Sequence, residues 1–343
     1  MRPKRYIIPV FVPHLGCPND CVFCNQKRIS GACQPATAET VKLAVERARE
    51  YMPKDAPGEI AFYGGSFTAI PVEQQLELLS AAGEFLRENP ENSLRLSTRP
   101  DCIEDTVLER LWKCGVKTIE LGSQSMDDEV LRLSGRGHTS EDTVKAAGLV
   151  KKWGFGLILQ MMTGLPGDTY EKCLETGRKI AELEPNGVRI YPTVVVKDTA
   201  LLDMWRDGKY KEHTVDEAVL WCCGLVRIFE EKNIPIIRLG LNPTEELSSG
   251  AAVGGAYHPA FGELVYSRLM LERVEEKLKK LSTNGKFEFS QIVLGVNGSC
   301  VSMMAGQKRR NIIALQEEFG IKSLRIIKDN IKWRDVNILS IAK

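Results

Sequence analysis

The sequence predicts an α/β fold: a partial (βα)6 TIM barrel followed by a small α/β domain. Apolar stretches of strand length alternate with amphipathic helical stretches between residues 37 and 239, which implies right-handed crossovers and a parallel sheet. The 343 residues, of which 43% are hydrophobic, suffice for a barrel-sized core and a smaller unit. We expect a barrel over residues 1–240, a lid loop and connecting helix over 241–285, and a basic domain over 286–343.

The expected elements follow one another as helix and strand. The first helix covers residues 37–51, with Thr37 or Thr40 as its N-cap. Further helices are expected at 71–88, 104–114, 140–153, 169–183 and 215–232. Strands are expected at 59–63, 94–98, 116–121, 155–161, 187–191 and 236–239. In a parallel barrel the residues just beyond each strand face a common site, so ligands are sought there.

A CxxxCxxC run, formed by Cys17, Cys21 and Cys24, precedes this alternation, with Phe23 just before the last cysteine. Three thiolates on one short loop can bind three irons of a [4Fe-4S] cube and leave the fourth iron open to a substrate or cosubstrate. The alternatives are a zinc site and a redox pair. Zinc would need a fourth ligand, and neither Cys33 nor His14 completes a known finger pattern.

Composition indicates a soluble cytoplasmic protein. No apolar stretch approaches the roughly 18 residues of a membrane helix, and the apolar residues after the basic start are interrupted by Pro9 and Pro13, unlike a signal peptide. The seven cysteines outside the motif show no disulfide framework, which favours a reducing compartment. The net charge of +1 argues against a generic nucleic-acid coat.

The cysteine run with its aromatic residue resembles the signature of the radical S-adenosylmethionine (SAM) enzymes. The resemblance implies a [4Fe-4S] cluster on Cys17, Cys21 and Cys24, and SAM bound to the open iron. It also implies an electron donor such as ferredoxin or flavodoxin, and reductive cleavage of SAM to a 5′-deoxyadenosyl radical. Phe23 would shield the cluster.

Several strand ends fit a SAM pocket. The glycines after strand 59–63 would let a ligand approach the backbone, and this stretch resembles the family motif that receives the SAM amino group. A plain turn is the alternative. Gln124 and Gln160 could bind the ribose, and glycines on both sides would expose Arg136 to a carboxylate, although a solvated arginine is the alternative. Residues 165–169 are expected to form a turn and helix cap. The expected cofactor-binding residues are Phe23, Gly64, Gly65, Ser66, Ser97, Gln124, Arg136 and Gln160.

A narrower resemblance runs from about residue 5 to about residue 268, to the radical SAM part of the catalytic Elongator subunit, which modifies the wobble uridine of tRNA. The motifs that carry it are STRPD at 97–101, ELGSQS at 120–125, RGHT at 136–139, MMTGLP at 161–166, IYPT at 190–193 and DMWRDGKY at 203–210. Ser97 stands where those relatives have a glutamate, and the present cysteine loop is shorter. The chain has no room for their acetyltransferase domain, so acetyl-CoA-dependent carboxymethylation is not expected.

The segment 242–257 is rich in glycine, serine and alanine, and we expect a flexible lid or a linker. His258 and Glu263 could contact substrate or serve only in capping and packing. Residues 286–343 carry ten basic and five acidic side chains, which suits a polyanion.

An extended run over 287–296 begins the tail, and a short helix from Ser299, a Gly-x-x loop, a helix over 310–319 and strands at 323–328 and from Lys332 are expected to follow. This order resembles a KH-like RNA-binding module, in which glycines let the nucleic-acid backbone approach. Arg309 replaces the second glycine of the loop. The expected RNA-binding residues are Gly306, Lys308, Arg309 and Arg310; a small cap with a solvated basic face is the alternative.

The leading hypothesis is a radical SAM enzyme that modifies RNA, with tRNA as the expected substrate. A second hypothesis keeps the chemistry and changes the substrate to a small molecule, tetrapyrrole or protein, as in the oxygen-independent coproporphyrinogen oxidases. A third is a non-catalytic RNA-binding protein that senses iron or oxygen with its cluster. The sequence leaves the oligomeric state open.

Overall fold

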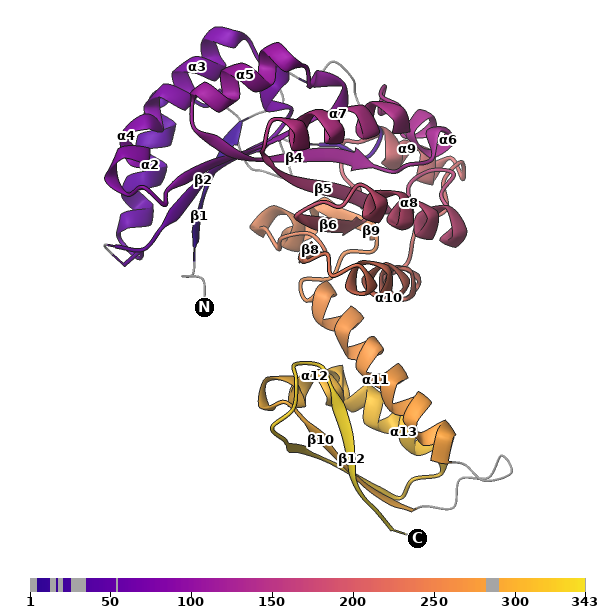
Figure 1. Cartoon of the computed structure of the whole chain (residues 1–343). Coiled ribbons are helices and arrows are strands. Elements are labelled where there is room, and N and C mark those ends of the chain that lie inside the picture. Colours follow the sequence, from indigo (N-terminus) through magenta and orange to yellow (C-terminus); the bar gives the residue numbers. More distant parts are fainter. Residues whose placement is uncertain are drawn as a thin grey trace. The chain divides into compact units, whose positions relative to one another are not determined.

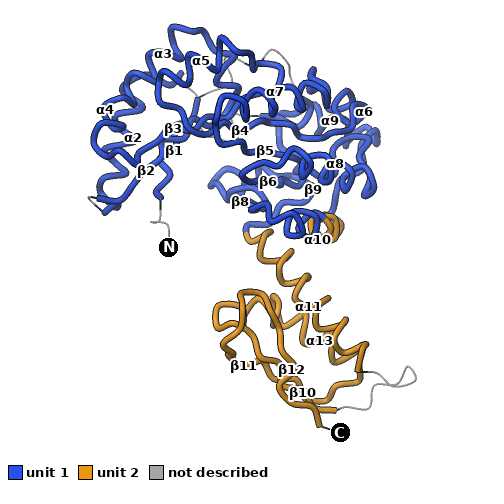
Figure 2. The backbone as a smooth tube through the Cα atoms, in the orientation of Figure 1, with its two compact units in different colours: residues 1–215, 225–259 blue, residues 216–224, 260–343 orange. Residues whose placement is uncertain are grey.

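The structure is a computed structural model that describes residues 5–12, 17, 21–25, 35–53, 55–281 and 290–342. The chain forms two compact units, shown in Figure 2. Unit 1 comprises Met1–Val215 and Leu225–Pro259, and unit 2 comprises Asp216–Gly224 and Ala260–Lys343. Their boundary runs through helix α10 (Val215–Glu231). Helix α11 (Phe261–Leu281), expected as part of a connecting segment, belongs to unit 2 by its contacts.

Unit 1 is built on a seven-stranded parallel sheet that curls into a half-barrel (Figure 1), which confirms the predicted fold class. The order is β1-β2-β3-β4-β5-β6-β8, so each strand pairs with the next strand of the barrel along the chain. The strands are β1 (Tyr6–Val12), β2 (Gly58–Gly64), β3 (Ser93–Thr98), β4 (Val116–Gln124), β5 (Gly156–Thr163), β6 (Gly187–Pro192) and β8 (Ile236–Leu239). All carboxyl ends therefore lie on one edge, where a site is expected.

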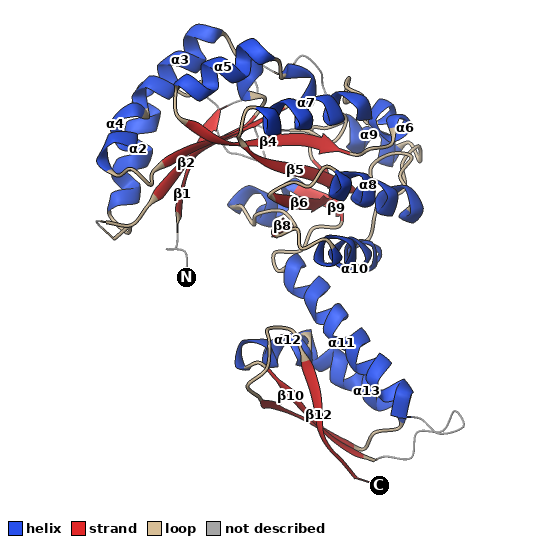
Figure 3. Cartoon of the chain, viewed as in Figure 1, coloured by secondary structure: helices blue, strands red, loops and turns tan. Residues whose placement is uncertain are grey.

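Helices cover the outer side of this sheet (Figure 3). They are α2 (Ala38–Arg49), α3 (Val72–Ala81), α4 (Gly83–Glu88), α5 (Asp105–Lys113), α6 (Asp128–Leu133), α7 (Ser140–Lys152) and α8 (Tyr170–Glu182). Thr37 caps α2 in a capping box with Thr40, as the sequence predicted, and Thr139 and Thr169 cap α7 and α8. Alternation along the strands buries Ile60, Phe62, Leu94 and Leu96 and their neighbours as the core of the unit.

The first strand, β1, was not predicted, because Pro9 interrupts its apolar pattern. β1 is an edge strand paired only with β2 among the described residues, and edge strands tolerate proline because one side of their backbone has no ladder to complete.

The segment 242–257, for which a flexible lid or a linker is expected, contains regular structure. Strand β9 (Ala252–Gly255) pairs antiparallel with β7 (Val194–Val196), and Leu247 and Ala251 are buried against β7. The glycines serve this packing: Gly255 has φ +79°, and a Cβ there would lie 2.8 Å from the carbonyl oxygen of Thr193. The small residues of this segment therefore allow β9 to approach β7 closely.

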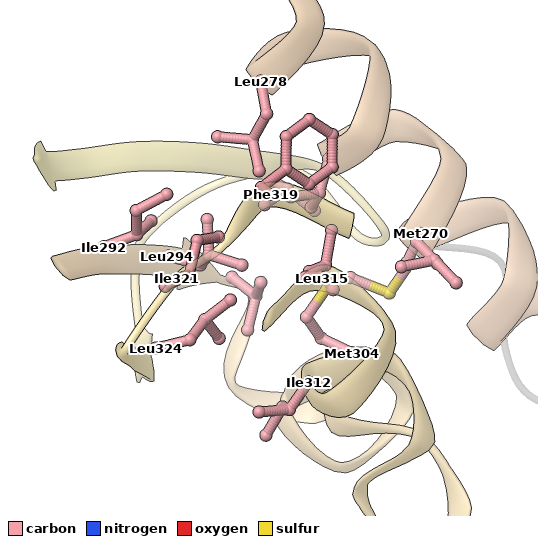
Figure 4. Close-up of a cluster of buried hydrophobic side chains, with 14 of the residues drawn as sticks. Met270, Leu278, Ile292, Leu294, Met304, Ile312, Leu315, Phe319, Ile321 and Leu324 are labelled. Carbon is pink, nitrogen blue, oxygen red and sulfur yellow. The ribbon is translucent and has the colours of Figure 1, made fainter. Parts of the chain in front are cut away.

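Unit 2 is an α/β unit with its own hydrophobic core. Strands β10 (Gln291–Val296), β11 (Ser323–Lys328) and β12 (Val336–Ala342) form a sheet in the order β11-β10-β12, with β11 parallel and β12 antiparallel to β10. Its helices are α11, α12 (Val301–Ala305) and α13 (Arg310–Phe319). Figure 4 shows side chains from both layers meeting in the core, among them Met270, Leu294, Leu315 and Phe319.

Two further findings concern the described part of the chain. None of its helices has the length and apolarity needed to traverse a lipid bilayer. Its cysteines form no disulfide.

Candidate functional site at the carboxyl edge of the half-barrel

Cys21 and Cys24 lie on a tight turn that is anchored at several points. The backbone N–H of Cys24 donates to the carbonyl oxygen of Cys21 at 3.0 Å. Val22 donates to Ser134 at 3.0 Å and accepts from the N–H of Leu201 at 2.8 Å. Residues 18–20 lie outside the described residues. The anchors hold the turn between the loop after α6 and the start of α9 (Ala200–Arg206).

Phe23 packs on the wall next to this turn. It contacts a buried cluster of Val195, Leu201, Leu202 and Tyr210, which belongs to β7, α9 and the chain that follows. The hydroxyl of Tyr210 in turn donates to the carbonyl oxygen of Gly164, just after β5, at 2.7 Å. An aromatic residue before the last cysteine thus ties the turn to the body of unit 1.

Arg136 binds the cysteine turn directly. Its Nη1 donates to the Sγ of Cys21 at 3.3 Å, and its Nη2 donates to the carbonyl oxygen of Gly122 in β4. The flanking glycines were expected to expose Arg136, but only 6% of the residue is exposed. The reason is that its guanidinium is drawn inward by the sulfur and the carbonyl oxygen, both hydrogen-bond acceptors.

Arg99, just after β3, is a buried residue whose role the sequence did not single out. Its guanidinium forms a bidentate pair with Asp101, with both N–O distances at 2.9 Å, and also donates to the backbone oxygen of Arg136. Arg99 therefore braces the loop that carries Arg136. The available signals were the position of Arg99 directly after a strand and its place in the STRPD motif at 97–101.

Cys17 lies close to the residues after β2 and β3. Burial raises the pKa of its thiol, whereas a backbone hydrogen bond from Ser66 and the positive charge of Arg99 oppose that rise. The Oγ of Ser66 accepts from the N–H of Arg99 at 3.2 Å and lies 2.8 Å from the Oγ1 of Thr98. Burial is the larger effect, so the free thiol of Cys17 holds its proton more tightly than an exposed cysteine does.

Gly64 and Gly65 both approach the backbone at the end of β1. Gly64 has φ +117°, and a Cβ on it would lie 2.4 Å from the carbonyl oxygen of Val12. The N–H of Gly65 donates to the same oxygen at 3.0 Å. Gly64 therefore allows the end of β1 to approach the end of β2.

The structure brings the two predicted glutamines together. Gln160 on β5 donates from Nε2 to the Oε1 of Gln124 at 3.3 Å. Gln124 ends β4 in a left-handed conformation, with φ 64°, and Gly122 leaves room for its amide, since a Cβ there would lie 2.9 Å from Nε2. Ser97 is half-buried on β3, in register with Glu120 on β4.

A charged ladder crosses the inner face of the sheet below these residues. Arg95 bridges two buried carboxylates, Glu59 at 2.7 Å and Glu120 at 2.8 Å. Arg189 on β6 lies 2.9 Å from Glu120 and donates to the hydroxyl of Tyr63 at 2.9 Å. Burial, and then the charge of Glu120, raise the pKa of Tyr63 to about 12. The phenol thus keeps its proton at neutral pH and can donate it in a hydrogen bond.

The remaining residues predicted to contact substrate or RNA are not among the groups described above. His258 is half-buried near the end of unit 1, and Glu263 lies in the first turn of α11 in unit 2. Gly306, Lys308, Arg309 and Arg310 also belong to unit 2, whereas the cysteine turn belongs to unit 1. Cys33 and His14 lie outside the described residues.

Two sequence-family profiles match the chain. Residues 11–180 match the Radical SAM superfamily and residues 185–271 match the Radical_SAM C-terminal domain. A tRNA uridine(34) acetyltransferase from Methanocaldococcus infernus is 30% identical over 181 residues, which is 47% of this chain and 34% of that protein. An uncharacterized protein from Methanocaldococcus jannaschii is 32% identical over 227 residues, 63% of this chain and 69% of that protein.

Solved structures show the same fold. The archaeal Methanocaldococcus infernus Elp3 with an N-terminal deletion superposes with a TM-score of 0.61 at 24% identity, over 81% of this chain and 64% of that chain. Coproporphyrinogen III oxidase from Escherichia coli superposes with a TM-score of 0.50 at 20% identity, over 67% of this chain and 53% of that chain. The chain spans about a third of the tRNA uridine(34) acetyltransferase above.

Radical SAM proteins use a [4Fe-4S] cluster and SAM, and the carboxyl edge fits such groups. Among the described residues, no three His, Cys, Asp or Glu side chains are grouped as ligands of a single metal ion. A [4Fe-4S] cluster does not need such a group, because each of its cysteine thiolates binds a different iron. Arg99 Nη1, Arg136 Nε and Ser123 Oγ are buried without a hydrogen-bond partner among the described residues. Unpaired buried donors are costly, so this edge suits an anionic or strongly polar ligand. The fold, the site and both profiles agree: the chain belongs to the radical SAM superfamily.

Proposed function

We propose that this chain cleaves SAM at its carboxyl edge and uses the reaction to modify RNA, with tRNA as the substrate. When bound, the cluster and SAM supply a 5′-deoxyadenosyl radical, and a donor such as ferredoxin or flavodoxin supplies the electron. The observation that carries this proposal is the meeting of Cys21, Arg136, Arg99 and Ser66 at one edge of the half-barrel.

The residues of the edge have distinct tasks in this proposal. Cys17, Cys21 and Cys24 would hold the cluster, and Phe23 would cover it from the α9 side. The polar groups after β2 to β5 would hold SAM. They are Gly64, Gly65, Ser66, Ser97, Gln124, Arg136 and Gln160. Because Arg99 fixes the Arg136 loop and Gln160 fixes Gln124, these groups are oriented before a ligand binds, which lowers the entropic cost of binding.

The inner face of the sheet would meet the substrate. Tyr63, Gln160 and Arg189 are each partly exposed there, and the carboxylate of Glu120 neutralises Arg189. The ladder holds its side chains in fixed positions, so it can exclude water from a reactive intermediate without moving.

Unit 2 supports the RNA substrate through one loop. Gly306, Lys308 and Arg309 have positive φ angles of 73°, 52° and 63°, which turn the chain sharply between α12 and α13. The side chains of residues 307–310 are exposed. Neither Lys308 nor Arg309 has an ion-pair partner among the residues that the structure describes, while Arg310 lies 3.5 Å from Asp216. Such unpaired cations are suited to phosphate contacts.

The choice of tRNA rests on the relatives. The matched proteins include tRNA uridine(34) acetyltransferases, and their similarity to this chain lies in about half of its length. The proposal takes from them the kind of substrate and leaves the transferred group open.

The SAM reaction is tested with anaerobically reconstituted full chain. We expect iron, sulfide and reductive release of 5′-deoxyadenosine, all of them lost in Cys17→Ala and Cys24→Ala. Cys114→Ala is the matched control, because Cys114 lies at the end of α5, away from the edge, and should leave all three unchanged. Zinc in place of iron, or iron retained by both variants, would refute the assignment.

RNA docking is tested by the salt dependence of tRNA binding. Replacing Lys308 and Arg309 together by glutamine should lower the slope of log affinity against log salt by about 1 to 2, because each phosphate contact contributes roughly 0.7 to 0.9. Lys322 and Arg325, both exposed in unit 2, give a control of equal charge when replaced by glutamine. An equal effect in both double variants would mean diffuse attraction without a docking loop. Modified nucleosides in total tRNA from cells with and without the gene would then identify the product.

A further inference from the structure

An exposed tryptophan stands in the turn between β11 and β12 of unit 2. Trp333 is 52% exposed, more than Trp112, the other exposed tryptophan, at 44%. Lys332, which precedes it, is exposed as well. An exposed indole is uncommon on a protein surface and more often marks a binding contact than an exposed leucine does.

Arg334 and Tyr266, the ring partners of Trp333 among the described residues, lie on one side of its indole. The guanidinium of Arg334 lies over the indole, 4.1 Å from its centroid, and also over the ring of Tyr266, at 4.3 Å. The two ring centroids are 5.6 Å apart, with the planes inclined at 66°. These three distances place Tyr266 on the same side of the indole as Arg334. The opposite side is covered by neither.

The step from Trp333 to Arg334 is held rigidly. Arg334 has a left-handed conformation with φ 63°, which residues other than glycine rarely adopt. Its N–H donates to the Sγ of Cys300 at 3.4 Å, and its carbonyl oxygen accepts from Arg273 on α11. Hydrogen bonds at both its N–H and its carbonyl oxygen therefore hold the backbone directly after Trp333.

The basic loop and the aromatic stack are attached to the same turn of α11. Asn311, at the end of the loop, is 2% exposed and donates to the backbone and side-chain oxygens of Ser267, at 3.0 Å each. Gly306 makes this possible, because a Cβ there would lie 3.0 Å from the Asn311 side chain. Tyr266, which directly precedes Ser267 in α11, contacts Arg334 and Trp333.

We propose that Trp333 is a stacking platform for an unpaired nucleobase of an RNA strand whose phosphates contact Lys308 and Arg309. This inference rests on the RNA docking proposed above and names the strand state that unit 2 recognises. Every base has an aromatic face, so an exposed indole flanked by cations binds single strands with little sequence preference and cannot reach the stacked bases of a duplex.

The test uses the full chain and a single-stranded oligouridylate, with the matching RNA duplex as comparison. Trp333→Ala should weaken single-strand binding by about 5- to 100-fold, the value of one base stack. Trp333→Tyr should retain most of the affinity. The salt slope should stay unchanged in both variants, because stacking releases no counterions, whereas the Lys308 and Arg309 double variant should change it. Duplex binding should be unaffected by Trp333→Ala.

Trp112 provides the matched control, since it is 44% exposed on unit 1 and has a cation, Lys117, over its ring. Trp112→Ala should leave RNA binding unchanged, and the quenching of tryptophan fluorescence by the oligonucleotide should disappear in Trp333→Tyr only. Normal single-strand affinity of Trp333→Ala with intact salt dependence would overturn the platform and leave RNA docking standing. Absence of binding by the unaltered chain would overturn both.

Discussion

The guanidinium of Arg136 donates a hydrogen bond to the sulfur of Cys21 at 3.3 Å, across 115 residues of sequence. A positive donor on a ligand sulfur stabilises the more negative, reduced state of a bound cluster. The same arginine reaches the backbone of β4, so the donor is fixed by the sheet.

Replacing Arg136 by glutamine should make the cluster harder to reduce. One hydrogen bond of about 1 kcal/mol corresponds to roughly 40 mV for a one-electron couple, so we expect a midpoint potential lower by on the order of 50 mV. Potentiometric titration followed by electron paramagnetic resonance measures it. Arg132→Gln removes an exposed charge on nearby α6 and should shift the potential far less. Equal shifts in the two variants would rule out the hydrogen bond as the cause.

Glu120→Gln should destabilise unit 1 strongly. Glu120 is 2% exposed and neutralises both Arg95 and Arg189, so the amide would leave two mostly buried cations with only the Glu59 carboxylate, paired with Arg95, to compensate them. Breaking such a pair costs about 3 to 5 kcal/mol. Urea titration of the cluster-free chain measures the loss, and Glu109→Gln, in an exposed pair with Lys113, should cost less than about 0.5 kcal/mol. A small effect at Glu120 would show that the ladder is hydrated.

Gly64→Ala should disturb the link between β1 and the cysteine loop. The new Cβ would collide with the carbonyl oxygen of Val12 and would need a φ of +117°, which alanine avoids. We expect lower stability, by about 2 kcal/mol or more, and reduced iron content after reconstitution. Gly83→Ala is the control, since nothing lies within 4 Å of a Cβ at that position and α4 favours alanine. Full iron content in Gly64→Ala would mean that β1 can shift without moving Cys17.

Asp168 should make stability depend on pH. Burial raises the pKa of its carboxyl to about 7, although the N–H groups of Gly164 and Thr169 donate to it. A raised pKa in the folded state means that the stabilising contribution is complete below about pH 4 and is lost as the pH rises to about 7.

Asp168→Asn keeps an acceptor for Gly164 and removes this titration. Between pH 4 and pH 7 the urea midpoint of the unaltered chain should therefore fall relative to that of Asp168→Asn. Glu141 forms an exposed ion pair with Lys145. The urea midpoint of Glu141→Gln should therefore change with pH in parallel with that of the unaltered chain. Parallel curves for Asp168→Asn would contradict the raised pKa.

The sequence predicted the barrel strands well because buried parallel strands are short apolar runs. Residues 94–98, with Leu94 and Leu96 buried, show this; β8, an edge strand without a buried residue, nevertheless has the predicted bounds. It missed β7 and β9, whose three and four residues carry too little pattern to distinguish a strand from a loop.

The candidate site was predicted only in part. Its side chains come together through the pairing of neighbouring strands, and their spacing along the sequence does not reveal this. Glu59, Arg95, Glu120 and Arg189 come from four strands, and their pairing follows only once the sheet order is known. The inward turn of Arg136 likewise depends on acceptors at Cys21 and Gly122, which local sequence does not reveal.

Pro9 has a consequence for association between molecules. The N–H of Tyr6 points to β2, where it donates to Pro57, so by strand alternation residue 9 faces the open border of the sheet. Proline has no backbone N–H to donate there. A strand from another molecule that paired with this edge of β1 would therefore lack one hydrogen bond in the middle of the pairing. The residue that hid β1 from sequence analysis thus discourages fibre-like stacking of one copy on another.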